Sequence, residues 1–430
     1  MIWPQEIEFQ YFILCGTYLC KPKMIRLLLL YKNSFSNIQK NIWVLAVAMF
    51  INRSGSMVLL FTSLYLTKSL GFSISQAGLI LSFYGIGGVL GSYAGGWLTD
   101  RRNFFDIMLF ALTLSGLLIL LMLLVTTPIM ICFVIFVHAF CADMFRPANA
   151  KAIAAYSEVS NRTRSVSLVR LAVNLGFSVG PAVGGFIALY FGYKWLFAID
   201  GLTSIGAAIM LYFYLPRQAD KLDHGISKVL EDKSSSAYRD VTYLTFIFLV
   251  TIFGICFFQL FASVPQYFST VCHYNEGIIG LLLALNGLLV VIIEMPFISL
   301  LEKKEKIFPF IVIGLLCIPI SFLILKLGEG LMLWAILYTF MITLSEIFAM
   351  PFIMNYSLSR PHQARQGQYS ALYSMSFGIA NIVAPIFGLG IAGRYGFNTL
   401  FFSIMALSSF AALGFMLLSK RDRREQMQRQ

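Results

Sequence analysis

Twelve apolar stretches, each long enough to cross a lipid bilayer, constrain the fold of this 430-residue chain more than any other feature. A helical span needs about 20 apolar residues. Only 12% of the residues are charged, against about 25% in a soluble domain, and the mean hydropathy is +0.79. We therefore expect an all-α integral membrane protein with no sizeable soluble domain. The expected spans are residues 42–66, 75–99, 104–126, 128–151, 164–191, 194–215, 240–268, 275–301, 306–327, 330–355, 366–393 and 397–419.

The second half of the chain repeats landmarks of the first half at an offset of 204 residues. The stretch 179–184, Val-Gly-Pro-Ala-Val-Gly, aligns with 383–388, Val-Ala-Pro-Ile-Phe-Gly, and Pro147 aligns with Pro351. Many transporters are built from two such repeats, with the substrate site between them. The repeat predicts two pseudo-symmetric halves of six transmembrane helices each.

The segments outside the halves are polar or lack a recognisable span. Residues 1–23 contain neither a membrane span nor a basic targeting signal, and Met24 offers an alternative start, so we consider both a start-site extension and a genuine cytoplasmic tail. The expected divisions are an N-terminal segment at 1–41, a six-helix half at 42–215, a cytoplasmic linker at 216–239, a second half at 240–419 and a basic tail at 420–430.

The basic residues are distributed unevenly between the two sides of the predicted bundle. With the N-terminus placed in the cytoplasm, 25 of the 32 Lys and Arg fall in or beside cytoplasmic segments. Three lie within spans, and the four on the external side are Lys68, Lys194, Lys326 and Arg394. This asymmetry follows the positive-inside rule, so we expect both termini in the cytoplasm and the chain in an inner or plasma membrane. It also accounts for the net charge of +12 without a nucleic-acid partner.

The connection after the second predicted span carries a recognisable motif. Gly96-Trp97-Leu98-Thr99-Asp100-Arg101 resembles the start of the loop motif Gly-x-Leu-Ala-Asp-Arg-x-Gly-Arg-Lys of the major facilitator superfamily. The end of the motif departs, because Asn103 replaces its second glycine and the basic pair is missing. The resemblance covers about residues 40–420 and implies a conformational latch at Asp100 and Arg101. From the residues alone, a solvated loop acid is the alternative for Asp100.

The fifth predicted span carries the pattern Gly176-x-x-x-Gly180-Pro181-x-x-Gly184-Gly185. Small residues let two helix backbones approach closely in lipid, and neighbouring groups satisfy the hydrogen bond that a proline cannot make. We therefore expect a bent helix packed tightly along its glycine face. The pattern also resembles the motif of the twelve-span drug–proton antiporter group within the superfamily.

Charged side chains inside spans are costly and are functional candidates. An isolated carboxyl group in a low dielectric tends to hold a proton near neutral pH. We expect Glu346 first, then Glu294 or Asp143, to couple transport to protons, and Arg53 or Arg146 to bind substrate or act as a counter-charge. The alternative is that these residues form fixed structural ion pairs. Arg170 lies near the cytoplasmic end of its span, where its side chain can reach water.

No cluster of metal-ligand spacing and no phosphate-binding Gly-x-x-x-x-Gly-Lys loop is present in the sequence, so we expect no metal, no cofactor and no enzymatic activity. The sequence predicts a monomeric secondary transporter that exports small amphipathic compounds by alternating access, with protons and a small molecule as its partners. One alternative is a proton symporter that imports a sugar, peptide or carboxylate. Another is a membrane receptor or sensor that transports nothing.

The distribution of basic residues predicts a testable topology. Tags at Gln430 and near Ser235 should be accessible only from the cytoplasm, and a cysteine at position 194 should react with a membrane-impermeant thiol reagent from outside. External labelling near Ser235 would contradict the whole assignment of spans.

Overall fold

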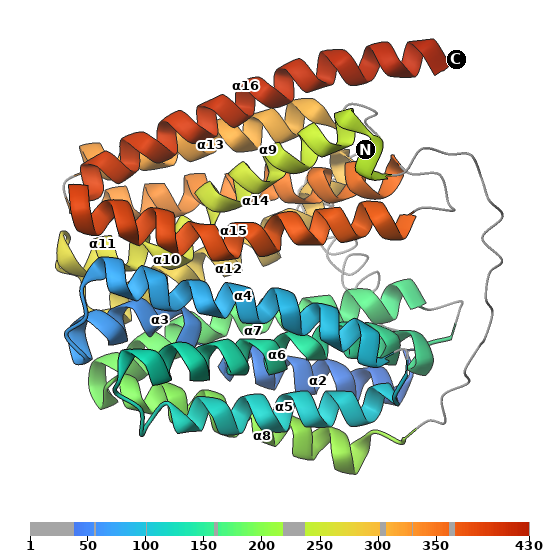
Figure 1. The fold of residues 1–430 in the computed structure, drawn as a ribbon, viewed down its shortest axis with the longest axis vertical. Coiled ribbons are helices and arrows are strands. Elements are labelled where there is room, and N and C mark those ends of the chain that lie inside the picture. Colours follow the sequence, from blue (N-terminus) through green and yellow to red (C-terminus); the bar gives the residue numbers. More distant parts are fainter. Residues whose placement is uncertain are drawn as a thin grey trace, which may run out of the picture.

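The computed structural model of the protein describes residues 38–55, 57–99, 101–158, 162–217, 237–301, 307–328, 330–360 and 366–429. Within these ranges the chain forms twelve helical segments that are long and apolar enough to cross a membrane, as the sequence predicts (Figure 1). The segment at 1–23, for which two origins were considered, lies outside the described residues.

The spans follow one another along the chain in two sets of six. The first six consist of α2 (Lys40–Gly55), α3 (Val58–Leu64) and the π-helix η1 (Tyr65–Ser69), then α4 (Ile74–Thr99), α5 (Phe104–Leu121), α6 (Pro128–Tyr156), α7 (Arg162–Phe191) and α8 (Tyr193–Tyr214). After the 3₁₀ turn η3 (Ala237–Arg239), the second six consist of α9 (Val241–Phe257), α10 (Gln259–Ala262) and α11 (Val264–Thr270), then α12 (Glu276–Leu301), α13 (Phe308–Leu327), α14 (Met332–Ser359), α15 (Gln366–Tyr395) and α16 (Phe397–Arg429).

The first span of each half is broken, although the hydropathy pattern predicts single helices. In the first half, α2 stops at Gly55, which packs onto Thr203 of α8 so closely that no other side chain fits. The Asn52 amide beside this break donates to the Ser204 hydroxyl at 3.1 Å. Backbone groups freed inside a bilayer must find partners within the protein. Close packing against α8 therefore stabilises the break.

The corresponding break in the second half contains Gln259 and Pro265. Proline lacks a backbone N–H and so suits the first turn of a new helix, here α11. The fully buried Gln259 amide donates to the carbonyl oxygens of Ile255 and Ala384, both at 3.0 Å, and accepts from the Ser263 hydroxyl at 2.8 Å. One side chain thus ties the interrupted span to α15.

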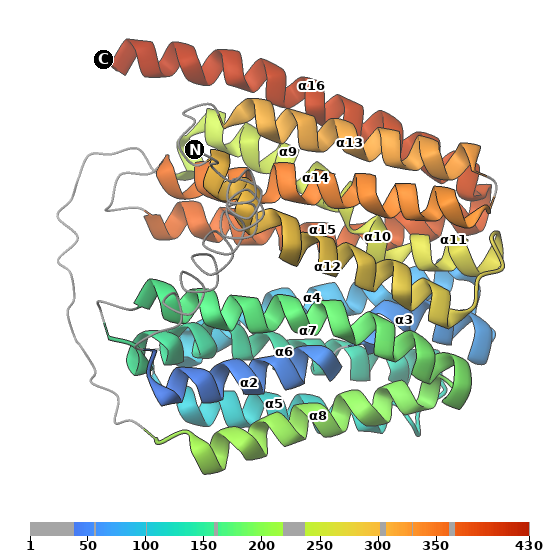
Figure 2. The same cartoon turned by 180° about the vertical axis from the view of Figure 1, so that it is seen from behind.

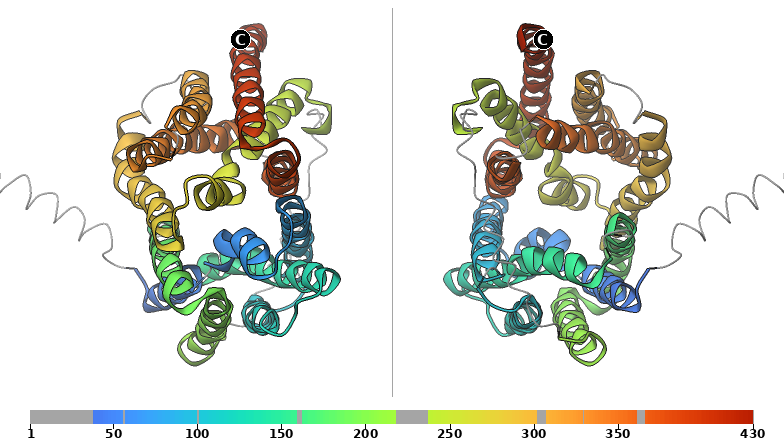
Figure 3. Two further views of the ribbon diagram at one scale, coloured as in Figure 1. Left: turned by 90° about the vertical axis from the view of Figure 1, so that its left-hand side faces the viewer. Right: turned by 90° about the vertical axis from the view of Figure 1, so that its right-hand side faces the viewer.

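The two halves meet mainly along two helix pairs, α4 with α15 and α7 with α12, and α3 also contacts α10 and α11. Viewed along the helices, these pairs lie on opposite sides of the molecule (Figure 3). We call the end of the bundle where α2 begins the Lys40 end, and the end where η1 finishes the Lys68 end. In Figure 2, α7 and α12 approach each other toward the Lys68 end and diverge toward the Lys40 end.

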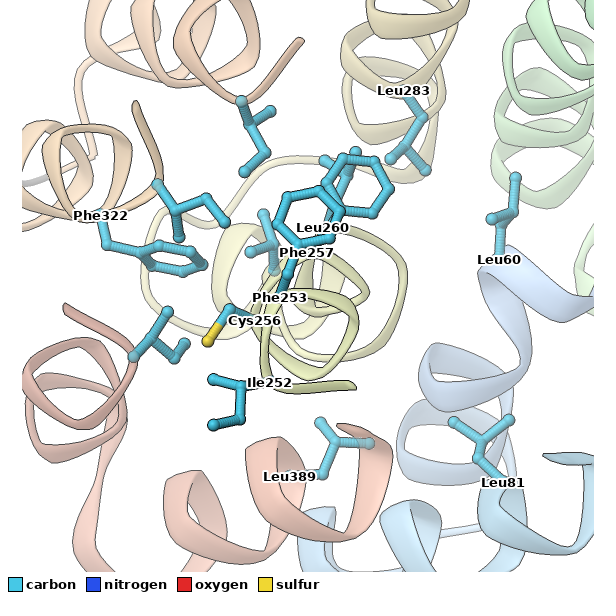
Figure 4. Close-up of a cluster of buried hydrophobic side chains, with 14 of the residues drawn as sticks. Leu60, Leu81, Ile252, Phe253, Cys256, Phe257, Leu260, Leu283, Phe322 and Leu389 are labelled. Atoms are coloured by element: carbon cyan, nitrogen blue, oxygen red, sulfur yellow. The ribbon is translucent and has the colours of Figure 1, made fainter. Parts of the chain in front are cut away.

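The buried apolar side chains follow the same division. One continuous cluster includes Leu60 and Leu81 of the first half together with Leu260, Leu283 and Leu389 of the second (Figure 4). A separate cluster fills the Lys40 end of the first half alone. Shared packing therefore joins the halves at the Lys68 end.

An ion network closes the Lys40 end of the second half. Arg360, at the end of α14, binds Asp240 at 2.8 and 2.9 Å and Asp422 of α16 at 2.5 Å. Asp422 also accepts from the Tyr356 hydroxyl at 2.7 Å. The sequence places Asp422 in the expected basic tail at 420–430. In the structure α16 continues through this segment and Asp422 is buried, because Arg360 and Tyr356 satisfy its carboxylate.

The network predicts a measurable loss of stability. Arg360→Met leaves two carboxylates without their cation and should lower the free energy of unfolding by about 3 kcal/mol, measured by thermal unfolding in detergent. Arg217→Met removes the exposed pair with Asp106 and should cost less than about 1 kcal/mol. Equal unfolding temperatures for the two variants would contradict this assignment.

The same network predicts a pH dependence. Burial alone would raise the pKa of Asp240, but hydrogen bonds from Arg360 and from the backbone N–H of Tyr243 outweigh burial and lower this pKa. A lowered pKa in the folded state gives stability that is full above the unfolded value of about 3.9 and is lost as the pH falls below it. When the pH is lowered below this value, the free energy of unfolding should therefore fall less for Arg360→Met than for the unmodified protein.

Candidate functional site

Arg53 lies beside the break in the first span, at the middle of the first half. Its guanidinium carbon stands 5.5 Å from the centre of the Phe177 ring on α7. Its charge is within interaction range of Tyr84, Asp143, Arg146 and Asp200, which come from α4, α6 and α8. Within the described residues, the buried Nε atom of Arg53 has no hydrogen-bond partner. The side chain thus belongs to a charge cluster but is not fixed by a direct ion pair through Nε.

Asp143 and Arg146 form the central ion pair of this cluster. The Arg146 Nε lies 2.8 Å from an Asp143 carboxylate oxygen, as their spacing of three on one helix face allows. The Asp143 side chain is 13% exposed, whereas that of Arg146 is 63% exposed. Asp143 also lies directly against Gly88 of α4, where any larger residue would displace it. The carboxylate is therefore held in place while its arginine partner remains accessible.

Sequence reasoning passed over Tyr84 and His138. The His138 ring lies 6.2 Å from the Tyr84 ring, and its Nδ1 is 3.0 Å from the Ser115 carbonyl oxygen. Asp200 is buried on α8 next to the start of α3. A lone histidine or tyrosine in an apolar span gives no signal of which neighbour it faces.

Glu346 marks the middle of the second half. The half-buried carboxylate on α14 accepts from the Asn286 amide of α12 at 3.2 Å. The same amide nitrogen donates to the Thr343 hydroxyl at 2.9 Å, one turn before Glu346. The helix α14 runs on without interruption through Pro351. Asn286 was missed, although a lone amide in the apolar run of α12 is a recognisable sequence signal.

The remaining acidic candidates are described only in part. Glu294 belongs to α12, but its side chain lies outside the described part of the structure, as does the whole of Asp100. The exposed Arg101 places its guanidinium carbon 3.8 Å from the centre of the Trp97 ring. The latch suggested for Asp100 and Arg101 therefore remains a prediction.

The glycine motif packs α7 against two neighbours, the first span and α12. A methyl group on Gly176 would lie 2.7 Å from the Arg53 Cβ, and one on Gly184 would lie 2.7 Å from the Met57 Cβ. Gly180 faces the backbone of Ser54. Gly185 points the other way, toward Gly280 of α12. The helix α7 thus carries the contacts of the first span on one face and of the second half on another.

Pro181 lies inside the uninterrupted helix α7, where its carbonyl group packs closely against Gly280. A membrane bundle with two repeated halves, helices in close glycine contact and charged side chains in the middle of its spans is typical of secondary transporters.

The chain belongs to the Major Facilitator Superfamily, whose sequence profile matches residues 43–385. This confirms the family and the twelve-span fold expected from the sequence. The chain is thus a multi-pass membrane transporter of small molecules.

Several known proteins are similar to the chain over most of its length. The Na(+), Li(+), K(+)/H(+) antiporter of Planococcus maritimus is 23% identical and covers 86% of the chain and 92% of its own length. The quinolone resistance protein NorA of Staphylococcus aureus is 23% identical over 74% of the chain and 81% of its own length. The crystal structure of a POT family transporter in complex with 5-aminolevulinic acid has a TM-score of 0.77 at 13% identity and covers 90% of the chain and 97% of its own length.

The close contact along α7 predicts a graded response to side-chain size. Gly184→Leu should push α7 from Met57 and lower the free energy of unfolding by about 2 kcal/mol, with Gly184→Ala milder, measured by thermal unfolding in detergent. Gly206 of α8 has open space beside it, so Gly206→Leu is the matched control and should unfold like the unmodified protein. Equal tolerance of leucine at both positions would mean that the α7 face meets lipid.

Proposed function

We propose that the protein is a proton-coupled exporter of small amphipathic compounds that works by alternating access. The observation that carries the proposal is the placement of one carboxylate near the middle of each half, Asp143 beside arginine and Glu346 beside an amide. Each carboxylate can gain and lose a proton, which is what coupling to a proton gradient requires.

The orientation in the membrane is part of the proposal. The Lys40 end carries most of the basic residues and would face the cytoplasm. The shared apolar cluster at the Lys68 end then closes the external side in this conformation. Substrate would enter between the halves from the cytoplasmic side and leave after the Lys68 end opens.

Glu346 is the first candidate for the proton carrier. Its Asn286 partner donates through an N–H group, and a carboxyl oxygen can accept that bond whether or not the acid is protonated. Proton gain and loss therefore need not break the contact between α12 and α14. Asp143 is the second candidate, because a proton bound there would remove the negative charge that pairs with Arg146.

The names of two relatives support export with antiport. One is an antiporter of monovalent cations and protons, and the other is a quinolone resistance protein. The second candidate function is proton-coupled import of an anionic substrate such as a carboxylate. The free Nε of Arg53 favours this alternative, because a guanidinium group recognises carboxylates.

The proposal predicts the behaviour of a neutral variant. Glu346→Gln keeps a hydrogen-bond acceptor for Asn286 but cannot release a proton. It should lose at least about 90% of uphill transport driven by a pH gradient in proteoliposomes, while exchange without a gradient continues. Glu346→Asp should keep part of the driven transport.

The exposed Glu158 provides a matched control, since Glu158→Gln makes the same chemical change outside the spans. It should transport as the unmodified protein does. If Glu346→Gln also retains driven transport with unchanged pH dependence, the proton role passes to Asp143 or Glu294. If the neutral variants of all three acids retain it, the proposal of coupling through a buried carboxylate is wrong.

A further inference from the structure

Glu276, the first residue of α12, is bonded to two side chains of the other half. Its Oε1 atom lies 2.7 Å from the Lys68 ammonium nitrogen and accepts from the Tyr193 hydroxyl at 2.5 Å. A weaker neutral contact lies in the same region, where the Thr67 hydroxyl donates to the side-chain amide oxygen of Gln266 at 3.2 Å. We call Glu276, Lys68 and Tyr193 the Glu276 clamp.

Local backbone features place both partners of Glu276. Lys68 belongs to the π-helix η1, a helix type that is frequent at functional positions. Tyr193 follows Gly192, whose φ of +89° allows the tight turn from α7 into α8. The ring of Tyr193 then packs 6.3 Å from the ring of Tyr65, which opens η1. The two groups that reach Glu276 are therefore held together by contacts within the first half.

The clamp has no charged equivalent across the pseudo-twofold axis. The position that repeats Glu276 is Ile74, the first residue of α4. Lys68 aligns with Thr270 at an offset of 202 residues, the offset that also relates Ile74 to Glu276, and Tyr193 aligns with Phe397 at the offset of 204 residues. On that side, α4 and α15 meet through small residues, with Gly393 against the backbone and hydroxyl of Ser75. Within the described residues, the ion pair that closes the Lys68 end thus lies on the α7–α12 side.

We propose that the Glu276 clamp, on the α7–α12 side alone, holds the Lys68 end shut and sets the balance between the two access states. Opening this end separates α12 from η1 and α8, so both bonds to Glu276 must break. The glycine contacts between the halves contain no directional bond and separate without such a loss. The inference requires only that the chain is a transporter of this family, whatever its substrate or coupling ion.

The size of the effect is set by exposure. The Lys68 side chain is 38% exposed and that of Glu276 is 12% exposed, so solvent screens the pair in part. Removing either charge should therefore shift the population of the open state about five-fold. A shift of this size changes the distribution between the states and leaves the folded structure in place.

The test measures distances and needs no substrate. Spin labels are attached at Leu124 and Leu331, two exposed positions at the Lys68 end of the first and second halves, after the seven native cysteines are replaced by serine. Double electron–electron resonance in lipid nanodiscs then reports the populations of short and long distances. Lys68→Ala and Glu276→Gln should each raise the long-distance population about five-fold, and Tyr193→Phe should raise it less.

Two further variants decide the interpretation. The charge exchange Lys68→Glu with Glu276→Lys should return the distances toward those of the unmodified protein, because the pair is restored in reverse. Lys194, next to Tyr193 and exposed, is the matched control, and Lys194→Ala should change nothing. The proposal is overturned if the single variants keep the original distances, if the exchange opens the end further, or if Lys194→Ala opens it as much as Lys68→Ala. None of these outcomes depends on proton coupling.

Discussion

Backbone hydrogen bonding in a medium without water is the constraint on which the rest of this structure depends. Inside a bilayer each N–H and C=O group needs a partner within the protein, so unbroken helices are the default. The chain departs from this default in the first span of each half. In each case an amide side chain, the half-buried Asn52 or the buried Gln259, bonds to a neighbouring helix at the break. These breaks put Arg53 and the charge cluster of the first half beside non-helical backbone, where side chains from several helices can converge.

The two halves share a fold but differ in their chemistry. The first half concentrates Arg53, Asp143 and Arg146 around the break in its first span. The second half places a single acid, Glu346, beside Asn286 and encloses its largest ion network at the Lys40 end, around Arg360. Pseudo-symmetry therefore supplies the scaffold and the two contact surfaces, while the functional groups are particular to each half. The Glu276 clamp follows the same rule, since its charges occur on one side only.

The fold can be predicted from the sequence far better than the site. Span length and hydropathy are local properties, so the amino-acid sequence alone indicates the twelve helices and the repeat. It also indicates the pairing of Asp143 with Arg146, because three residues along a helix fix their proximity. In contrast, the partner of Glu346 lies 60 residues away, and the burial of Asp422 depends on Arg360, 62 residues earlier. Such contacts depend on how helices are rotated about their axes, which hydropathy does not determine.

The contacts between the two halves help determine the free energy required to switch between the two access states. A ligand must bind one state about 10⁴-fold more tightly than the other to shift the populations from 1:99 to 99:1, and this corresponds to about 5.5 kcal/mol. Gly78, Gly185 and Gly280 bring backbones of opposite halves together without hydrogen bonds between them, so these surfaces can separate with little directional loss. Opening the Lys68 end must also separate the apolar cluster that the two halves share there, and the bonds to Glu276 add directional contacts to that packing. A proton or a bound substrate shifts the balance between the two states only by binding one of them more tightly than the other.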